Sequence, residues 1–367
     1  MGTRTALFEP LNLGPLTLAN RLAVAPMTRV SATQSGEATA RMAHYYERFA
    51  EGGFGLVITE GVYTDERWSQ GYFHQPGLAN AAQRDAWRSV VERVHAAGAR
   101  IIAQLMHAGA LSQGNRFVGS TRGPSANRPV GQQMGFYRGV GDYPLPQAMS
   151  EAEIDQAVAG FAAAALRARE AGFDGVEVHG ANGYLLDQFL SEGVNLRSDG
   201  YGGTVAKRLR ITEEVVRAVR AAVGDDYLIG LRSSQGKVND FQHKWRGTQE
   251  AAEIYTRVGR LPLDYLHTTE FEAWRPAFEN GPSLAALARQ HAGLPVLANG
   301  SLHDPERAAA MLAVGAADMV TLGRGALAHA DWPQRVRSGA TLREFDRRIL
   351  SPLADLANAD RIQTATP

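Results

Sequence analysis

The segment SEAEIDQAVAGFAAAALRAREAGFDGVEVHGANGY, residues 150–184, holds one helix and one strand that together indicate the fold. Ser150 and Glu153 have the spacing of a capping box, in which each side chain accepts a hydrogen bond from the other residue's backbone N–H at a helix start. The apolar residues that then recur on one helical face are Ile154, Val158, Phe161 and Ala165. The helix is predicted to end at Gly172, and Gly175–Gly180 follows as a short, buried strand.

This alternation of apolar strand and helix recurs along the chain, which is typical of a parallel sheet covered by helices. The eight predicted strands are Arg21–Met27, Phe54–Glu60, Arg100–His107, Gly175–Gly180, Tyr227–Ser233, Asp264–Thr269, Pro295–Gly300 and Asp318–Arg324. Eight such units favour an α/β fold, the (β/α)8 TIM barrel, because an open doubly wound sheet would use fewer strands and a GxGxxG turn after the first. We predict a single barrel domain over residues 1–367, with a C-terminal tail at 338–367.

Segments outside the repeating unit are placed at the two ends of the barrel. Residues 9–19 predict a hairpin around Gly14–Pro15 that plugs the N-terminal end. Residues 108–148 form an inserted loop or cap after the third strand, far longer than an ordinary connection. Further long loops follow the fifth and sixth strands, at Gln235–Gly247 and Glu270–Pro282. These loops emerge at the C-terminal face, where the active sites of such barrels lie.

The composition limits the classes of function. Of the 367 residues, 44% are hydrophobic and 21% are charged, which is ordinary for a globular protein. Lys plus Arg equals Asp plus Glu at 38 each, so no net charge favours nucleic acid or an anionic membrane as partner. The absence of cysteine excludes thiolate metal sites, Fe–S clusters and cysteine nucleophiles, and no metal site is predicted. Because no secretory or membrane-spanning segment is recognised, we expect a cytoplasmic protein, either a monomer or a homo-oligomer.

Two polar side chains inside predicted strands need partners. Gln104 lies in the third strand, where an unpaired buried amide costs about 1–3 kcal/mol. A bound heterocycle would satisfy it, and so would backbone or water in an ordinary core. Arg232, in the fifth strand, stays charged at any ordinary pH and needs an anion. That anion is either part of a ligand or a neighbouring Asp or Glu.

The last two strands end in glycines at the face where such barrels commonly bind phosphate. Gly300 follows Asn299 after the seventh strand, and Gly323 precedes Arg324 after the eighth. Two turns that require glycine would give the same pattern. The adjacent cation favours a phosphate-bearing ligand.

His179, Asn182 and Tyr184 follow the fourth strand within six residues of the chain. His and Asn are donors that can bind one carbonyl oxygen together, and the Tyr hydroxyl can deliver a proton. A single histidine here would more often be structural. Two donors and an acid at the barrel mouth favour a catalytic group, and a structural histidine stays the alternative.

With these residues in place, the sequence resembles the Old Yellow Enzyme family of FMN-dependent ene-reductases, from Phe8 to about Arg337. The matching segments are Ala25–Arg29, Ile58–Gly61, Gln70–Tyr72, Pro76–Gly77, Gln104–Gly109, Val176–Leu190, Asn195–Gly203 and Gly323–Arg324. The chain departs from the family after Leu342, where the aromatic, proline-rich ending of the family is missing.

The resemblance implies an oxidoreductase with FMN across the barrel mouth and NAD(P)H as its reductant. The implied FMN contacts are Ala25, Pro26, Met27, Thr28, Gly61 and Gln104 along the ring, Arg232 at its pyrimidine end, and Gly300, Gly323 and Arg324 at the phosphate. It implies a small activated alkene as substrate, such as an enal, enone, maleimide or nitroalkene. His179 and Asn182 would bind the carbonyl oxygen, flavin N5 would deliver hydride to the β-carbon, and Tyr184 would protonate the α-carbon.

Two other classes of function remain open. A flavin-free barrel lyase or aldolase would bind a sugar phosphate through Arg324, and an aldolase of that kind would need a lysine near a strand end. The predicted strands offer none, because Lys237 and Lys244 are placed in loops. A non-catalytic flavin-binding barrel would keep the same binding residues.

Overall fold

The computed structural model describes residues 4–364, in which eight parallel strands close into a barrel. Neighbours around the barrel follow the order of the chain, and the last strand pairs with the first. The strands are β3 (Leu22–Val24), β4 (Leu56–Tyr63), β5 (Arg100–Met106), β8 (Gly175–Asn182), β9 (Leu228–Lys237), β10 (Tyr265–Thr269), β11 (Val296–Asn299) and β12 (Met319–Leu322). The predicted (β/α)8 barrel is confirmed. Its extent over the whole chain stays a prediction, and residues 1–3 and 365–367 lie outside the described part.

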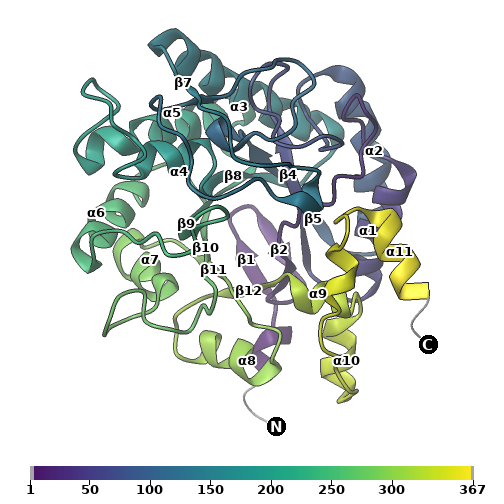
Figure 1. Ribbon diagram of the computed structural model, residues 1–367. Coiled ribbons are helices and arrows are strands. Elements are labelled where there is room, and N and C mark those ends of the chain that lie inside the picture. The colour runs from purple at the N-terminus through teal and green to yellow at the C-terminus, as the bar shows by residue number, and fades with distance from the viewer. Residues whose placement is uncertain (1–3, 365–367) are drawn as a thin grey trace.

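Helices surround the barrel (Figure 1). Those between strands are α1 (Ala40–Glu51), α2 (Ala81–Ala96), α3 (Glu151–Ala171), α4 (Leu185–Leu190), α5 (Val205–Val223), α6 (Thr248–Val258), α7 (Leu284–Ala292) and α8 (Pro305–Ala313). After β12 come α9 (Arg324–Ala328), α10 (Trp332–Ser338) and α11 (Leu356–Thr364). The predicted capping box starts α3, with both Ser150 and Glu153 in their expected hydrogen bonds. Among residues 4–364, no helix is long and apolar enough to cross a membrane.

The predicted hairpin closes the N-terminal end of the barrel. Strands β1 (Leu11–Leu13) and β2 (Leu16–Leu18) pair antiparallel around Gly14, whose φ of 53° suits glycine. Leu13 and Leu18 are buried and pack in one cluster with inward residues of the barrel strands. The partners of the hairpin in this cluster are Ala23, Leu56, Ile58, Ile102, Leu228, Tyr265, Leu297 and Met319.

Residues 108–148 lie over the barrel mouth as a cap with little regular structure. The cap contains the single turns η2 (Gly109–Leu111) and η3 (Gly135–Tyr137), and the short parallel strands β6 (Arg122–Gly123) and β7 (Gln147–Ala148). The C-terminal segment reaches back to it, where Ala354 N–H donates to the Phe136 carbonyl at 2.9 Å and Arg138 forms an ion pair with Asp355. The atypical tail therefore holds part of the cap in place.

Strand β9 is longer than predicted, and the placement of Lys237 in a loop was wrong. The strand runs to Lys237, which pairs in register with Asn182 of β8 after an irregularity in the ladder. The amphipathic lysine stem and a buried carboxylate partner allow the charged residue to end a buried strand. In the sequence, a lysine that follows polar residues gives no sign that the strand continues to it.

Candidate active site

His179 lies near the C-terminal end of β8 and is buried, with 3% of its surface exposed. Burial and the nearby Arg232 lower the pKa of His179 to about 3, so the imidazole is neutral at physiological pH. Ala181 N–H donates to its Nδ1 at 3.3 Å, so the ring proton lies on Nε2. His179 thus offers one neutral N–H donor.

Asn182 ends β8 in a left-handed backbone conformation, with φ of 61°. Asn tolerates this conformation better than most residues, and its backbone N–H donates to the Ser234 hydroxyl at 2.8 Å. No hydrogen bond of the Asn182 side chain occurs within residues 4–364. The amide is therefore available to a ligand.

A buried ion pair supports this turn from behind. Lys237 Nζ lies 2.9 Å from both carboxylate oxygens of Asp187, with 4% and 0% of the two side chains exposed. Asp187 also accepts the Gly183 N–H at 2.6 Å. Because its amine is bound to a carboxylate, Lys237 is not the free strand-end lysine that an aldolase would need.

Tyr184 follows the same turn and faces His179, with ring centroids 4.9 Å apart in an edge-on arrangement. Its hydroxyl oxygen lies 2.5 Å from that of Tyr72, in the loop after β4. Burial raises the pKa of both phenols well above the ordinary value, so both are protonated at physiological pH. Tyr184 therefore carries a proton in a dry setting.

The cap adds two further tyrosines to this wall. The ring of Tyr137, in η3, lies 4.8 Å from that of Tyr72, and its hydroxyl bonds to Thr28. Tyr143 is fully buried in the same cluster of side chains as Tyr72 and Tyr184. We call Tyr72, Tyr137, Tyr143 and Tyr184 the tyrosine cluster. It excludes water from the space beside His179.

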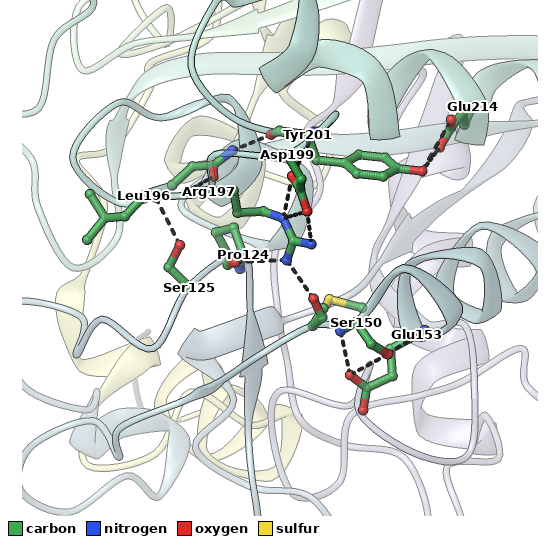
Figure 2. Close-up of polar contacts among 11 residues, drawn as sticks. Pro124, Ser125, Ser150, Glu153, Leu196, Arg197, Asp199, Tyr201 and Glu214 are labelled. Atoms are coloured by element: carbon green, nitrogen blue, oxygen red, sulfur yellow. Dashed lines mark hydrogen bonds and ion pairs between the residues drawn. The ribbon is translucent and has the colours of Figure 1, made fainter.

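Arg197, in the loop after α4, binds the chain within the cap and directly after it (Figure 2). Its Nη1 donates to the carbonyls of Pro124 at 3.1 Å and Met149 at 2.5 Å. Asp199 accepts from the other side of the guanidinium, and the Asp199 carboxylate also accepts the Tyr201 N–H at 3.0 Å. The segment Asn195–Gly203, which matched the family motif, thus braces the cap.

Arg232 of β9 is a buried cation without an ion pair within residues 4–364. Its Nη2 donates to Asn299 Oδ1 at 3.1 Å, and its buried Nε has no hydrogen-bond partner. The sequence left a neighbouring Asp or Glu open as the partner of Arg232, but within residues 4–364 no such carboxylate forms a direct ion pair with it. An orphaned guanidinium N–H at the barrel mouth fits an anionic ligand, as FMN requires.

The amide of Gln104 has a partner that the sequence did not predict, because another side chain accepts a hydrogen bond from its nitrogen. Its Nε2 donates to Glu177 Oε1 at 2.7 Å, and both residues are buried. Its side-chain oxygen accepts no hydrogen bond in the described part of the chain. A ligand is therefore needed only for that oxygen.

The predicted phosphate residues lie together after β11 and β12. Gly300 has φ of 142°, and a Cβ there would lie 2.2 Å from the Glu270 carbonyl oxygen, so the turn requires glycine. Arg324 follows Gly323, is exposed, and donates to the Ser301 hydroxyl at 2.6 Å. The hydrogen bond from Arg324 to Ser301 thus joins the turn after β11 to the turn after β12.

The residues after β3 lie beside those after β12, because the two strands pair in the barrel. Ala25 is buried and donates its N–H to the Leu322 carbonyl at 3.0 Å, whereas Pro26, Met27 and Thr28 are half-buried. At Gly61, a Cβ would lie 2.6 Å from Met106 Sδ. Glycine at this position leaves room for the Met106 side chain to pack against β4.

The structure brings His179 and Tyr184 into contact and joins Arg232 to Asn299, the last residue of β11, directly before Gly300. The cofactor and substrate roles of the predicted residues stay predictions. Sequence reasoning missed Glu177 and gave no role to Tyr72. Glu177 was detectable, since it lies two residues before His179 on one strand and so faces the same side.

Comparison with known proteins agrees with this geometry. Residues 6–343 match the NADH:flavin oxidoreductase / NADH oxidase family. A probable flavin mononucleotide-dependent alkene reductase of Leishmania infantum is 35% identical over 352 residues, covering 93% of this chain and 92% of that protein. The NADH oxidase of Thermoanaerobacter brockii is 33% identical over 344 residues, covering 91% of this chain. The chain spans 51% of that oxidase's length.

A solved structure gives the same result. The old yellow enzyme homologue from Zymomonas mobilis superposes with a TM-score of 0.87 at 31% identity, covering 97% of this chain and 99% of that one. The resemblance to the Old Yellow Enzyme family is thereby confirmed. The chain belongs to the NADH:flavin oxidoreductase / NADH oxidase family and is an oxidoreductase with FMN as cofactor and NAD(P)H as reductant.

Proposed function

We propose that the protein is an ene-reductase that reduces the activated C=C bond of α,β-unsaturated carbonyl compounds, including enals, enones and maleimides, and also nitroalkenes. The observation that carries the proposal is the pairing of a neutral His179 donor with a protonated Tyr184, with ring centroids 4.9 Å apart. The His179 N–H can donate a hydrogen bond to a carbonyl oxygen, and the Tyr184 hydroxyl can give a proton to a carbon.

His179 and Asn182 bind the carbonyl oxygen of the alkene. A neutral imidazole with its proton on Nε2 donates one hydrogen bond, and the free Asn182 amide donates a second. Both strengthen as negative charge grows on the oxygen, so they favour attack at the β-carbon. Burial of His179 increases this effect, because the local dielectric is low.

Tyr184 protonates the α-carbon. Its hydroxyl oxygen lies 2.5 Å from that of Tyr72, so once Tyr184 has given up its proton, the Tyr72 hydroxyl can donate to the charged oxygen and stabilise it. The tyrosine cluster keeps bulk water away from both groups.

When it is bound, FMN supplies the hydride, and NAD(P)H returns the oxidised flavin to its reduced form. The residues that would hold it are Ala25, Pro26, Met27, Thr28, Gly61 and Gln104 along the ring, Arg232 at its anionic edge, and Gly300, Gly323 and Arg324 at the phosphate. The orphaned Arg232 Nε and the free Gln104 oxygen support these roles.

The test uses purified protein loaded with FMN. We expect NADPH or NADH to bleach the flavin anaerobically, and cyclohexenone or N-ethylmaleimide to restore its colour with one equivalent of reduced alkene. A flavin that is reduced but is not reoxidised by any activated alkene would contradict the proposal and favour a flavin-binding protein without catalysis.

Tyr184→Phe tests the role of the phenol. Alkene reduction is expected to slow by about 10²–10⁴, the usual contribution of a positioned general acid, while flavin reduction by NADPH keeps its rate. Stopped-flow measurement of the two half-reactions separates them. Equal losses in both would show that Tyr184 acts on cofactor binding and not on proton transfer.

A further inference from the structure

A chain of hydrogen bonds crosses the barrel one layer below the catalytic side chains. Glu177 Oε1 accepts from Gln104 Nε2 at 2.7 Å, and Oε2 accepts from the Tyr265 hydroxyl at 3.0 Å and from His267 Nδ1 at 2.8 Å. His267 Nε2 lies 2.9 Å from the Thr321 hydroxyl. Glu177, Tyr265 and His267 are fully buried. Side chains of β5, β8 and β10 thus meet at one carboxylate, and β12 joins the network through His267.

The barrel makes room for this network at one position of β9. A Cβ on Gly230 would lie 2.0 Å from Cζ of Tyr265, so any larger residue would displace the ring that reaches Glu177. Glu177 and His179 are two residues apart on β8 and face the interior together. The network is therefore built into the layer that underlies the active site.

Glu177 fixes which end of the Gln104 amide faces the mouth. Its carboxylate can only accept, so the amide nitrogen of Gln104 must turn toward it. The Gln104 oxygen is then left as an acceptor for a ring N–H of a ligand. If the amide were reversed, the Gln104 oxygen would lie against a carboxylate oxygen of Glu177.

Glu177 also offsets a buried positive charge. Burial acts to raise the pKa of Glu177, but His267 and Arg232 outweigh it and hold the pKa at about 2. The Glu177 carboxylate is therefore ionised at physiological pH. Burial lowers the pKa of Arg232, and among the nearby charges Glu177 has the largest effect on that pKa and opposes the lowering, although Arg232 makes no direct ion pair in residues 4–364.

From this arrangement we propose that Glu177 is a positioning residue for FMN, which orients the Gln104 amide and offsets Arg232 and so sets how easily the bound flavin accepts electrons. The proposal rests on the proposed function, because it places FMN at the barrel mouth. Reduction adds negative charge to the flavin, and a nearby fixed carboxylate opposes that addition.

Glu177→Gln tests the charge. With FMN bound to the variant, the two-electron midpoint potential of the flavin is expected to be more positive than in the wild type by about 30 mV or more. A shift of about 30 mV equals a tenfold change in the equilibrium constant for flavin reduction. Anaerobic reduction beside a reference dye measures it. A variant that binds FMN at an unchanged potential would overturn the proposal.

Tyr265→Phe is the matched control. It removes one hydrogen bond from the same carboxylate and leaves both the charge and the Gln104 contact in place. Its potential is expected to equal that of the wild type. A shift as large as that of Glu177→Gln would assign the effect to packing and overturn the proposal.

A second variant covers the case in which Glu177→Gln does not fold. Gln104→Leu keeps the carboxylate charged but removes the oriented amide, and the dissociation constant of FMN is expected to rise about tenfold, the effect of one hydrogen bond. Unchanged affinity would overturn the proposal. Wild-type protein that binds no FMN would overturn both this inference and the proposed function, whereas bound FMN without alkene reduction would overturn the proposed function alone.

Discussion

At the scale of single residues, the hydroxyls of the tyrosine cluster differ in their partners. Tyr72 and Tyr184 share a hydrogen bond of 2.5 Å, whereas the buried hydroxyl of Tyr143 has no partner in residues 4–364. A hydroxyl that contacts the proton donor can stabilise its charged form, and an unpartnered one cannot. Tyr72 is therefore a positioning residue for Tyr184.

Tyr72→Phe is expected to slow alkene reduction by about tenfold to a hundredfold, since a hydrogen bond to a charged group contributes about 1.5–3 kcal/mol. Reoxidation of the reduced enzyme by ferricyanide, which requires no carbon protonation, should keep its rate. Tyr143→Phe is the matched control and should leave both rates unchanged. A Tyr72→Phe variant as fast as Tyr143→Phe would remove Tyr72 from the mechanism.

His179 links the active site to stability. Burial and Arg232 lower its pKa to about 3 in the folded protein, against about 6.5 for an unfolded histidine. The unfolded chain binds the extra proton between these values, so this contribution to stability is complete above about pH 6.5 and is lost as the pH falls toward 3.

Replacing His179 by Gln removes this titration. Between about pH 7 and about pH 5, the wild type should lose more free energy of unfolding than His179→Gln, by up to about 1.4 kcal/mol per pH unit below pH 6.5. Urea denaturation of both proteins at the two pH values measures the difference. Equal losses would mean that His179 takes up its proton without unfolding.

At the scale of elements, the cap depends on a loop that contributes nothing to the chemistry itself. Arg197 binds the carbonyl of Pro124, within the cap, and that of Met149, directly after the cap, and its side chain is 10% exposed (Figure 2). The cap in turn carries Tyr137 and Tyr143. Loss of this brace should loosen the substrate wall before it affects the barrel.

Arg197→Met leaves two carbonyls unpaired, at a cost of about 1–3 kcal/mol. We expect faster protease cleavage within residues 108–148 and a several-fold higher KM for the alkene. Arg210→Met is the control, because Arg210 is 51% exposed and its pair with Glu214 is a surface pair. Equal protease sensitivity in the two variants would contradict a bracing role for Arg197.

At the scale of the whole molecule, the barrel separates stability from chemistry along its axis. The hairpin and the first residues of the strands form an apolar cluster at the N-terminal end, and the polar network of Glu177 lies between this cluster and the mouth. The C-terminal end carries the active site, as in other barrels of this type.

Leu13→Ala probes this division. Leu13 is fully buried in the hairpin, so the substitution is expected to cost about 2–5 kcal/mol of unfolding free energy. FMN affinity and the rate of alkene reduction should stay at wild-type values at temperatures where the variant is folded. Calorimetry and a flavin titration check the two statements, and loss of FMN affinity in the folded variant would contradict them.

The sequence by itself determined the elements and the residues of the barrel mouth. Continuous apolar runs, the capping box at Ser150 and the turn at Gly14 are local signals, and each led to the observed element. The order of motifs along the chain also led to the family. These features need only neighbouring residues, so a linear pattern can show them.

The tertiary structure alone decided which polar groups meet. Glu177 and His267 are 90 residues apart, Tyr72 and Tyr184 are 112 apart, and Lys237 lies 50 residues from Asp187. A charge inside an apolar strand shows that a partner is needed but does not name it, because the partner comes from strand order and register. Closure of the barrel brought these side chains within hydrogen-bond distance, and that closure gave Tyr184 and Gln104 their partners.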